Sequence, residues 1–136
     1  MTAEQCLQSL LGKWSQAAAT WDATALGACY TDDAALHGGR PGHSLGRQAI
    51  TAYFASYDGV IRSGSVTALD QEVAAPCEGL LVAQGHVRML FVLASGSETG
   101  NVLRSTLVLR EQDGQWRIWR HHFSPIPDAP PLGDRK

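Results

Sequence analysis

Residues 104–124 read RSTLVLREQDGQWRIWRHHFS, and this stretch decides the fold class. The segments on either side of Asp113-Gly114 are rich in aliphatic, β-branched and aromatic residues, which favour strands. An Asp-Gly pair between two such segments is a strong signal for a β-hairpin. The stretch therefore predicts two long antiparallel strands, the second of which carries two adjacent histidines.

Outward from this hairpin, the hydrophobic period changes once along the chain. In the first half, apolar residues recur at spacings of three and four, which indicates amphipathic helices over residues 3–19, 23–30 and 47–57. A short strand at 33–38 and a glycine-rich loop precede the last helix. In the second half, strand-like runs cover residues 65–75, 80–95, 101–112 and 115–124. This order predicts an α+β fold with the helices on one face of a curved antiparallel sheet.

Length and composition set wide limits on function. The chain of 136 residues suits one domain, and its formal net charge of -2 gives no general attraction to nucleic acid or anionic membranes. The three cysteines lie far apart without a CxxC pair, so they predict neither a disulfide framework nor a zinc site. No signal peptide and no membrane-length apolar run is recognised. We therefore expect a cytoplasmic protein.

The domain is expected to occupy residues 1–124. The remaining residues, 125–136, read PIPDAPPLGDRK and are rich in proline and polar types. Such a composition predicts an extended or disordered C-terminal tail.

Three markers give the chain a resemblance to a known superfamily: YTDDAALHG, GRQAITAYF and the hairpin quoted above. In this order they resemble the NTF2-like superfamily, in its SnoaL-like or DUF4440-like branch, over about residues 4–124. The hairpin is also similar to the association domain of calcium/calmodulin-dependent protein kinase II. The resemblance implies an NTF2-like (cystatin-like) cone, with three N-terminal helices packed on a curved, mostly antiparallel sheet that encloses a pocket. Because members include isomerases, polyketide cyclases, dehydratases and non-catalytic association domains, the fold alone does not give the function.

Charged residues in the predicted strands point to the site chemistry. Carboxylates are scarce there, and Asp70 and Glu72 are expected to be a solvated pair. Arg88 interrupts the otherwise apolar run HVRMLFVLA, two residues after His86 and so on the same face. Because arginine is rarely buried without a partner, Arg88 is expected either to bind an anion inside the cone or to pair with an acid such as Asp33 or Glu72.

Alternation divides the last strand into two faces. One face carries Trp116, Ile118, Arg120 and His122, and the other carries Arg117, Trp119, His121 and Phe123, unless a bulge shifts the register. The resemblance to the kinase domain carries its pocket arginines over to Arg88, Leu107 and Phe123, of which only the first is a cation here. It thus implies a largely apolar pocket with one cation, faced by His121 and Trp119. The opposite face, with Trp116 and Ile118, is expected to be covered by a second copy in a homodimer.

The combined prediction is a protein that binds a small molecule in the cone, with catalysis left open. The candidate catalytic residues are His121, as an acid or base, and Arg88. The candidate ligand-binding residues are Trp21, His37, Tyr53, Phe54, His86, Leu107, Trp119 and Phe123. We expect no metal, cofactor, nucleic acid or membrane partner. The alternatives are a non-catalytic association domain and an isomerase or polyketide-cyclase type of enzyme with a histidine base.

Overall fold

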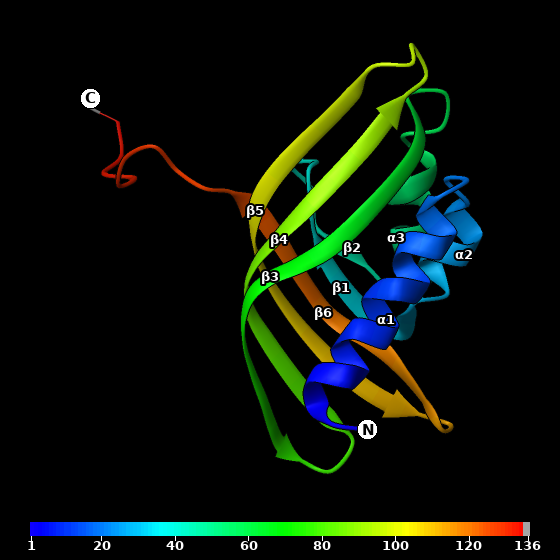
Figure 1. The fold of residues 1–136 in the computed structure, drawn as a ribbon, viewed down its shortest axis with the longest axis vertical. Coiled ribbons are helices and arrows are strands. Elements are labelled where there is room, and N and C mark those ends of the chain that lie inside the picture. Colours follow the sequence, from blue (N-terminus) through cyan, green and yellow to red (C-terminus); the bar gives the residue numbers. More distant parts are fainter. Residues whose placement is uncertain (135–136) are drawn as a thin grey trace.

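The computed structural model describes residues 1–134, which form three helices and six strands. The helices are α1 (Ala3–Ala18), α2 (Ala23–Gly27) and α3 (Arg47–Ala55). The strands are β1 (Tyr30–His37), β2 (Ser44–Leu45), β3 (Ile61–Cys77), β4 (Leu80–Leu93), β5 (Glu98–Gln112) and β6 (Gln115–Pro125). All three helices lie on one face of a strongly curved sheet (Figure 1), so the predicted α+β class is confirmed.

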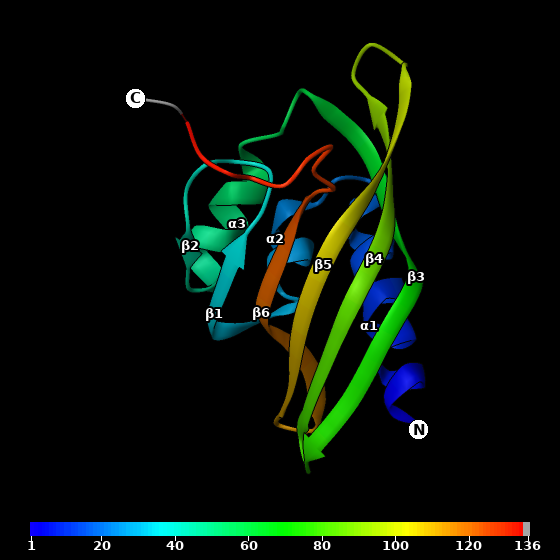
Figure 2. The same ribbon diagram turned by 90° about the vertical axis from the view of Figure 1, so that its left-hand side faces the viewer.

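The six strands form one sheet in the order β2-β1-β6-β5-β4-β3. β3, β4, β5 and β6 make an antiparallel meander, and the predicted hairpin at Asp113-Gly114 joins β5 to β6. β1 pairs with β6 in parallel, and the short β2 pairs with β1 in antiparallel. Figure 2 looks onto the outer face of the sheet, with α1 behind β3 and β4 and α3 beside β1 and β2.

Helix α1 supplies most of the helical side of the core. It begins with a capping box, in which the Thr2 hydroxyl accepts the Gln5 backbone N–H and the Gln5 side chain accepts the Thr2 N–H. Its apolar stripe consists of Leu7, Leu10, Leu11 and Trp14, each 5% exposed or less. Burial of one such side chain contributes about 2 kcal/mol, so this stripe fixes α1 against the concave face of the sheet.

The first half of the sheet differs from its predicted limits. β1 begins at Tyr30 and not at residue 33, because Tyr30 pairs with Ile118 of β6. The expected loop after β1 contains β2, whose Ser44 and Leu45 pair with β1. Both differences come from pairing with distant or neighbouring strands, which local composition does not show.

A bulge in β6 overturns part of the predicted alternation. Val108 pairs with Arg120, but Leu109 pairs with Ile118, so Trp119 is an extra residue on β6. The bulge places both Ile118 and His121 on the inner face, which the helices cover. Ile118 is fully buried, so the prediction that it faces outward is wrong.

Trp116 packs against the same core, so its expected outward position is also wrong. These two residues were the reason for expecting a covered outer face, and that reason no longer holds.

The chain beyond β6 leaves the body of the molecule. Residues 126–134 contain no helix or strand and extend away from the sheet (Figure 1). Residues 135 and 136 of the predicted tail lie outside the described residues. Within residues 1–134, none of the helices has the length and apolar character that a membrane span requires.

Candidate functional site

A cavity of about 260 Å³ opens between α1, α3 and the inner face of the sheet. Its lining is mostly aromatic and aliphatic. The lining residues are Trp14, Trp21, Gly38, Gly39, Tyr53, Phe54, Tyr57, Ile61, Met89, Phe91, Asn101, Leu103, Phe123, Ser124 and Pro125. No charged side chain and no histidine is among them, so this is an apolar pocket with a few neutral polar groups.

Trp21 forms the centre of the aromatic wall. Its ring meets Trp14, Phe54, Tyr57 and Phe91 edge to face, with centroids 6.0–6.5 Å apart. Its indole N–H donates to the Phe54 carbonyl oxygen at 3.0 Å, which fixes the orientation of the ring. Edge-to-face pairs of this kind favour one arrangement of the rings, so the wall is preformed.

The polar groups of the pocket belong to Tyr53, Tyr57, Ser124 and Asn101. The Tyr53 hydroxyl accepts the Gly39 backbone N–H at 2.7 Å, and burial raises the pKa of this phenol well above its usual value. The residue before Gly39 must be glycine, because a Cβ on Gly38 would lie 2.4 Å from the Tyr53 hydroxyl oxygen. The turn after β1 therefore sits directly against the pocket wall.

His121 lies behind this wall in a buried network. Its Nδ1 is 2.8 Å from the Tyr30 hydroxyl, which also lies 3.4 Å from Nε1 of Trp14. The indole can only donate, so the Tyr30 oxygen accepts that proton and gives its own to Nδ1. Burial lowers the pKa of His121 to about 3, so the ring is neutral and carries its proton on Nε2.

Four of the predicted ligand-binding residues line the pocket: Trp21, Tyr53, Phe54 and Phe123. His121 is on the inner face but only 7% exposed, and it is not part of the lining. Leu107 is also on the inner face, but it is 1% exposed and belongs to the closed core, so its assignment to the pocket is corrected.

The predicted position of Arg88 is wrong. Its neighbours Val87 and Met89 point inward and are buried, so alternation along β4 turns Arg88 outward, where it is exposed. It makes no ion pair among the residues that the structure describes. The pocket therefore lacks the single cation that was expected in it.

His86 is on the outer face of β4, away from the pocket. Its Nδ1 is 2.7 Å from an Asp70 carboxylate oxygen, and this contact lowers the pKa of Asp70. His37 is exposed, with its ring 4.0 Å from that of His43. Neither histidine lines the pocket, which corrects both assignments.

Trp119 also faces outward, as the extra residue of the β6 bulge. The guanidinium groups of Arg110 and Arg120 lie over its ring, at 4.9 and 4.4 Å from the centroid. The prediction that Trp119 lines the pocket is therefore wrong. Its ring packs against the guanidinium groups of both arginines.

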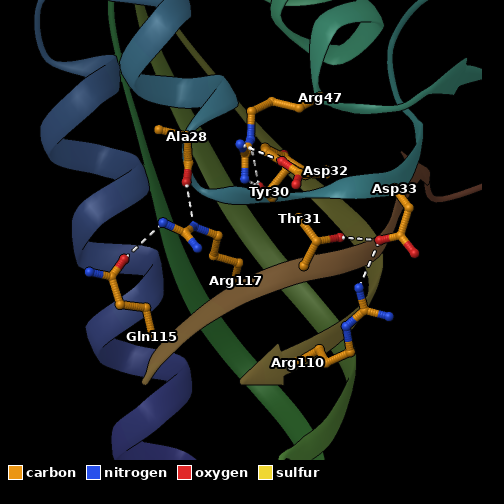
Figure 3. A network of polar contacts seen from close by, with 9 residues as sticks. All are labelled: Ala28, Tyr30, Thr31, Asp32, Asp33, Arg47, Arg110, Gln115 and Arg117. Carbon is orange, nitrogen blue, oxygen red and sulfur yellow. Dashed lines mark hydrogen bonds and ion pairs between the residues drawn. The ribbon is translucent and has the colours of Figure 1, made fainter. Parts of the chain in front are cut away.

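The acids at the start of β1 are part of a polar network rather than of the pocket (Figure 3). Asp33 accepts hydrogen bonds from the Thr31 hydroxyl and from Arg110, and these contacts lower the pKa of its carboxyl. Asp32 pairs with Arg47 at 2.6 Å, and Arg47 also donates to the Tyr30 carbonyl. The network ties α3 and β5 to β1, which is a structural role.

Several pocket residues were missed in the sequence. Met89 and Leu103 lie on the same face of their strands as the buried residues two positions away. Alternation within β4 and β5 could therefore have identified them. Tyr57 continues the spacing of Tyr53 along and just beyond α3. Gly38 and Gly39 carried no signal, because their role depends on a side chain from another element.

Within residues 1–134, no group of three or more His, Cys, Asp or Glu side chains is arranged to hold a metal ion. The pocket lining contains none of these residue types. The lining therefore consists of apolar surface with a few neutral polar groups.

Comparison with known proteins agrees with the architecture. A family model described as a SnoaL-like domain matches residues 7–129, which is most of the chain. The search of curated proteins found no match.

Solved structures share the fold at low sequence identity. A Xanthomonas campestris protein, provisionally assigned as a calcium/calmodulin-dependent protein kinase II association domain, superposes with a TM-score of 0.81 and 22% identity over 90% of this chain and 87% of its own. An NTF2-like superfamily protein from Salmonella enterica serovar Typhimurium has a TM-score of 0.75 and 17% identity, with 97% of each chain covered.

A Novosphingobium aromaticivorans protein, provisionally assigned as a scytalone dehydratase, has a TM-score of 0.73 and 14% identity over 98% of this chain and 95% of its own. Other matched structures are described as having a cystatin-like fold. The predicted NTF2-like, cystatin-like fold is thus confirmed, and at these identities the likeness reaches no further than the fold.

Proposed function

This chain belongs to the SnoaL-like domain family, and from that premise we propose that it binds a small, neutral and largely apolar organic molecule in the cavity beside Trp21. The observation that carries the proposal is the lining itself, which combines a preformed aromatic wall with no charged side chain. Apolar pockets with a few placed polar groups are the usual form of small-molecule sites.

The size and polarity of the pocket define the ligand class. A volume of about 260 Å³ suits a molecule of one or two rings. The hydroxyls of Tyr53 and Tyr57 and the Asn101 amide offer hydrogen bonds to a hydroxyl or carbonyl group of the ligand. A carboxylate would lose its hydration without gaining a cation, so the pocket favours neutral ligands over anions.

The same lining argues against acid–base catalysis. An isomerase or cyclase needs a base within hydrogen-bond reach of the substrate. His121 is excluded from the lining, and its pKa of about 3 makes it a weak base. The pKa of Tyr53 is raised, which keeps this phenol protonated. We therefore propose binding without proton transfer, even though one fold neighbour is provisionally assigned as a dehydratase.

The experiment titrates a neutral naphthylamine fluorophore into the protein and into two tryptophan variants. Asn101→Trp places a bulky ring at the exposed edge of the pocket, and Gln8→Trp places the same ring on the exposed side of α1. We expect saturable fluorescence in wild type and Gln8→Trp, and an affinity about tenfold lower in Asn101→Trp, a loss of about 1.4 kcal/mol. Equal affinities in all three proteins would place the fluorophore elsewhere and contradict the proposal.

We also propose that the protein forms a homodimer through the part of the outer sheet face that carries Leu69 and Leu90. These leucines are 45% and 46% exposed on neighbouring strands, where an apolar contact between two copies would cover them. Light scattering after gel filtration tests this: Leu90→Arg is expected to yield a monomer, whereas Leu132→Arg in the tail leaves the mass unchanged. A monomeric wild type would reject the dimer, and a larger ring would favour the alternative of an association domain.

A further inference from the structure

The outer face of the sheet carries a block of polar side chains that the pocket does not use. On three adjacent strands, the pairing register places six residues in two cross-strand rows. One row is His86, Arg104 and Ser124, and the other is Gln84, Thr106 and His122. Directly paired residues have Cβ atoms about 5 Å apart on one face, so these six side chains form one contiguous patch. We call it the outer polar patch.

The outer polar patch lines a shallow groove of about 410 Å³ on β4, β5 and β6. The groove lies across the sheet from the apolar pocket, and Ser124 of β6 takes part in both linings. Its Oγ is buried and has no hydrogen-bond partner among the described residues. A buried hydroxyl without a protein partner is uncommon in folded proteins, and a water or a ligand can supply that partner.

Charge within the lining of the groove is unbalanced, because the patch has one guanidinium and two imidazoles but no carboxylate. Among the acids outside the lining, Asp70 holds His86 at 2.7 Å, Asp33 holds Arg110 at 2.8 Å, and Glu72 is the register partner of Gln84. Arg104 is exposed and makes no ion pair within residues 1–134.

Histidine side chains continue the patch onto β1. His37 is the register partner of His122, and the two rings lie 6.0 Å apart. The ring of His43 lies 4.0 Å from that of His37. The edge of the groove is thus bordered by further imidazoles, while the chain as a whole has a net charge of -2.

From this arrangement we propose that the outer polar patch binds a small oxyanion, such as a sulfate or phosphate group, with Arg104 as its main ligand. The guanidinium supplies a fork of N–H donors that matches an oxyanion. Thr106 and Ser124 carry hydroxyl groups on the neighbouring positions, and His122 supplies a ring N–H group. His86 donates its Nδ1–H to Asp70, so Nε2 of the neutral ring is an acceptor, and His86 borders the site without donating to the anion.

The test titrates sodium sulfate into the whole protein against sodium chloride at matched ionic strength. Histidine ring signals are followed by NMR, because four of the five histidines lie in or beside the patch and His121 is buried on the other face. We expect saturable shifts of the His86 and His122 signals, and a constant His121 signal. Linear shifts without saturation, or equal shifts in chloride, would overturn the proposal.

Two arginine variants give the matched control. Arg104→Gln removes the central donor, and Arg88→Gln removes an equally exposed arginine two residues after His86 on the same face. We expect Arg104→Gln to weaken sulfate binding about tenfold, which corresponds to about 1.4 kcal/mol, and Arg88→Gln to weaken it less than about twofold. An equal loss in both variants would show a general charge effect and overturn the site.

Sedimentation at the same sulfate concentrations separates anion binding from pairing of two copies through this face. Saturable NMR shifts at constant mass support the proposal. A rise in mass in step with the shifts would mean that the signals report association, and it would overturn the assignment of the groove to a bound anion.

Discussion

His121 and His122 are neighbours in the sequence, but their environments are opposite. His121 is 7% exposed, accepts a hydrogen bond from Tyr30 on the inner face of the sheet, and has a pKa lowered to about 3. His122 is exposed on the outer face, beside Thr106 in the outer polar patch. The same side chain is a neutral part of the core in one position and a surface donor in the next.

One strand thus contributes side chains to two different surfaces. The inner face of β6 presents Ile118, His121 and Phe123 to the core and the pocket, and its outer face presents His122 and Ser124 to the groove. The bulge at Trp119 sets which residue goes where, because it shifts the alternation by one position. Chemistry at each face then depends on burial and partners, and not on residue type.

The largest expected effect concerns the acid sensitivity that His121 confers. In the unfolded chain this ring has the ordinary pKa of 6.5, whereas in the folded protein the pKa is about 3. Above pH 6.5 both states are neutral and the full stability is present. As the pH falls toward 3, only the unfolded state takes up the proton, so stability is lost. Between about pH 7 and pH 4.5 the loss from this group is about 2.5 kcal/mol.

Urea unfolding at a series of pH values measures this loss. His121→Asn is expected to flatten the pH dependence over this range, whatever its stability at neutral pH. His122→Asn is the matched control and should keep the wild-type slope. If both variants kept that slope, the buried neutral histidine would not be the source of the acid sensitivity.

Much of the fold could be predicted from the sequence because its signals are local. Asp113-Gly114 marks the β5–β6 hairpin by turn chemistry alone, and the spacing of Leu7, Leu10 and Trp14 marks the buried stripe of α1. Together with the three markers, these patterns led to the SnoaL-like family, which the family model confirms.

The pocket residues could be predicted only in part, because the wrong assignments depend on the register of the strands. Trp119 was placed inside since a bulge leaves no mark in the alternation of QWRIWRHHFS. Arg88 was placed inside by analogy, although the parity of Val87 and Met89 on the same strand points it outward. Aromatic residues of α3 and its surroundings were found, because helical spacing shows which side faces the core.

A smaller effect is expected when Tyr30 is replaced. Tyr30→Phe leaves Nδ1 of His121 and the indole N–H of Trp14 without their shared partner in a buried site. Such a change costs about 1 to 2 kcal/mol in the free energy of unfolding. The control is Tyr53→Phe, which frees the exposed Gly39 N–H to bond to water and should cost less. Urea unfolding at neutral pH compares them, and an equal or greater cost for Tyr53→Phe would contradict the network.

The smallest effect is expected on the outer face, at the pair of Asp33 and Arg110. Asp33→Asn keeps the shape of the side chain but removes its charge, and the exposed carboxylate is screened by water and salt. The expected loss is therefore about 0.5 kcal/mol or less. The pKa of Asp33 is lowered by Thr31 and Arg110, so its contribution is present above the ordinary carboxyl pKa of 3.8 and is lost as the pH falls below it.

Thermal unfolding with and without added salt measures this contribution. High salt should remove most of the difference between Asp33→Asn and wild type, since it screens the same interaction. Loss of the Asp33–Arg110 ion pair also frees Arg110, which lies over the Trp119 ring. Arg120 still packs on that ring and holds it in place. A salt-independent loss as large as that of Tyr30→Phe would mean that the outer network supports the fold as strongly as the inner one. The contrast between the faces of β6 would then lie in exposure alone.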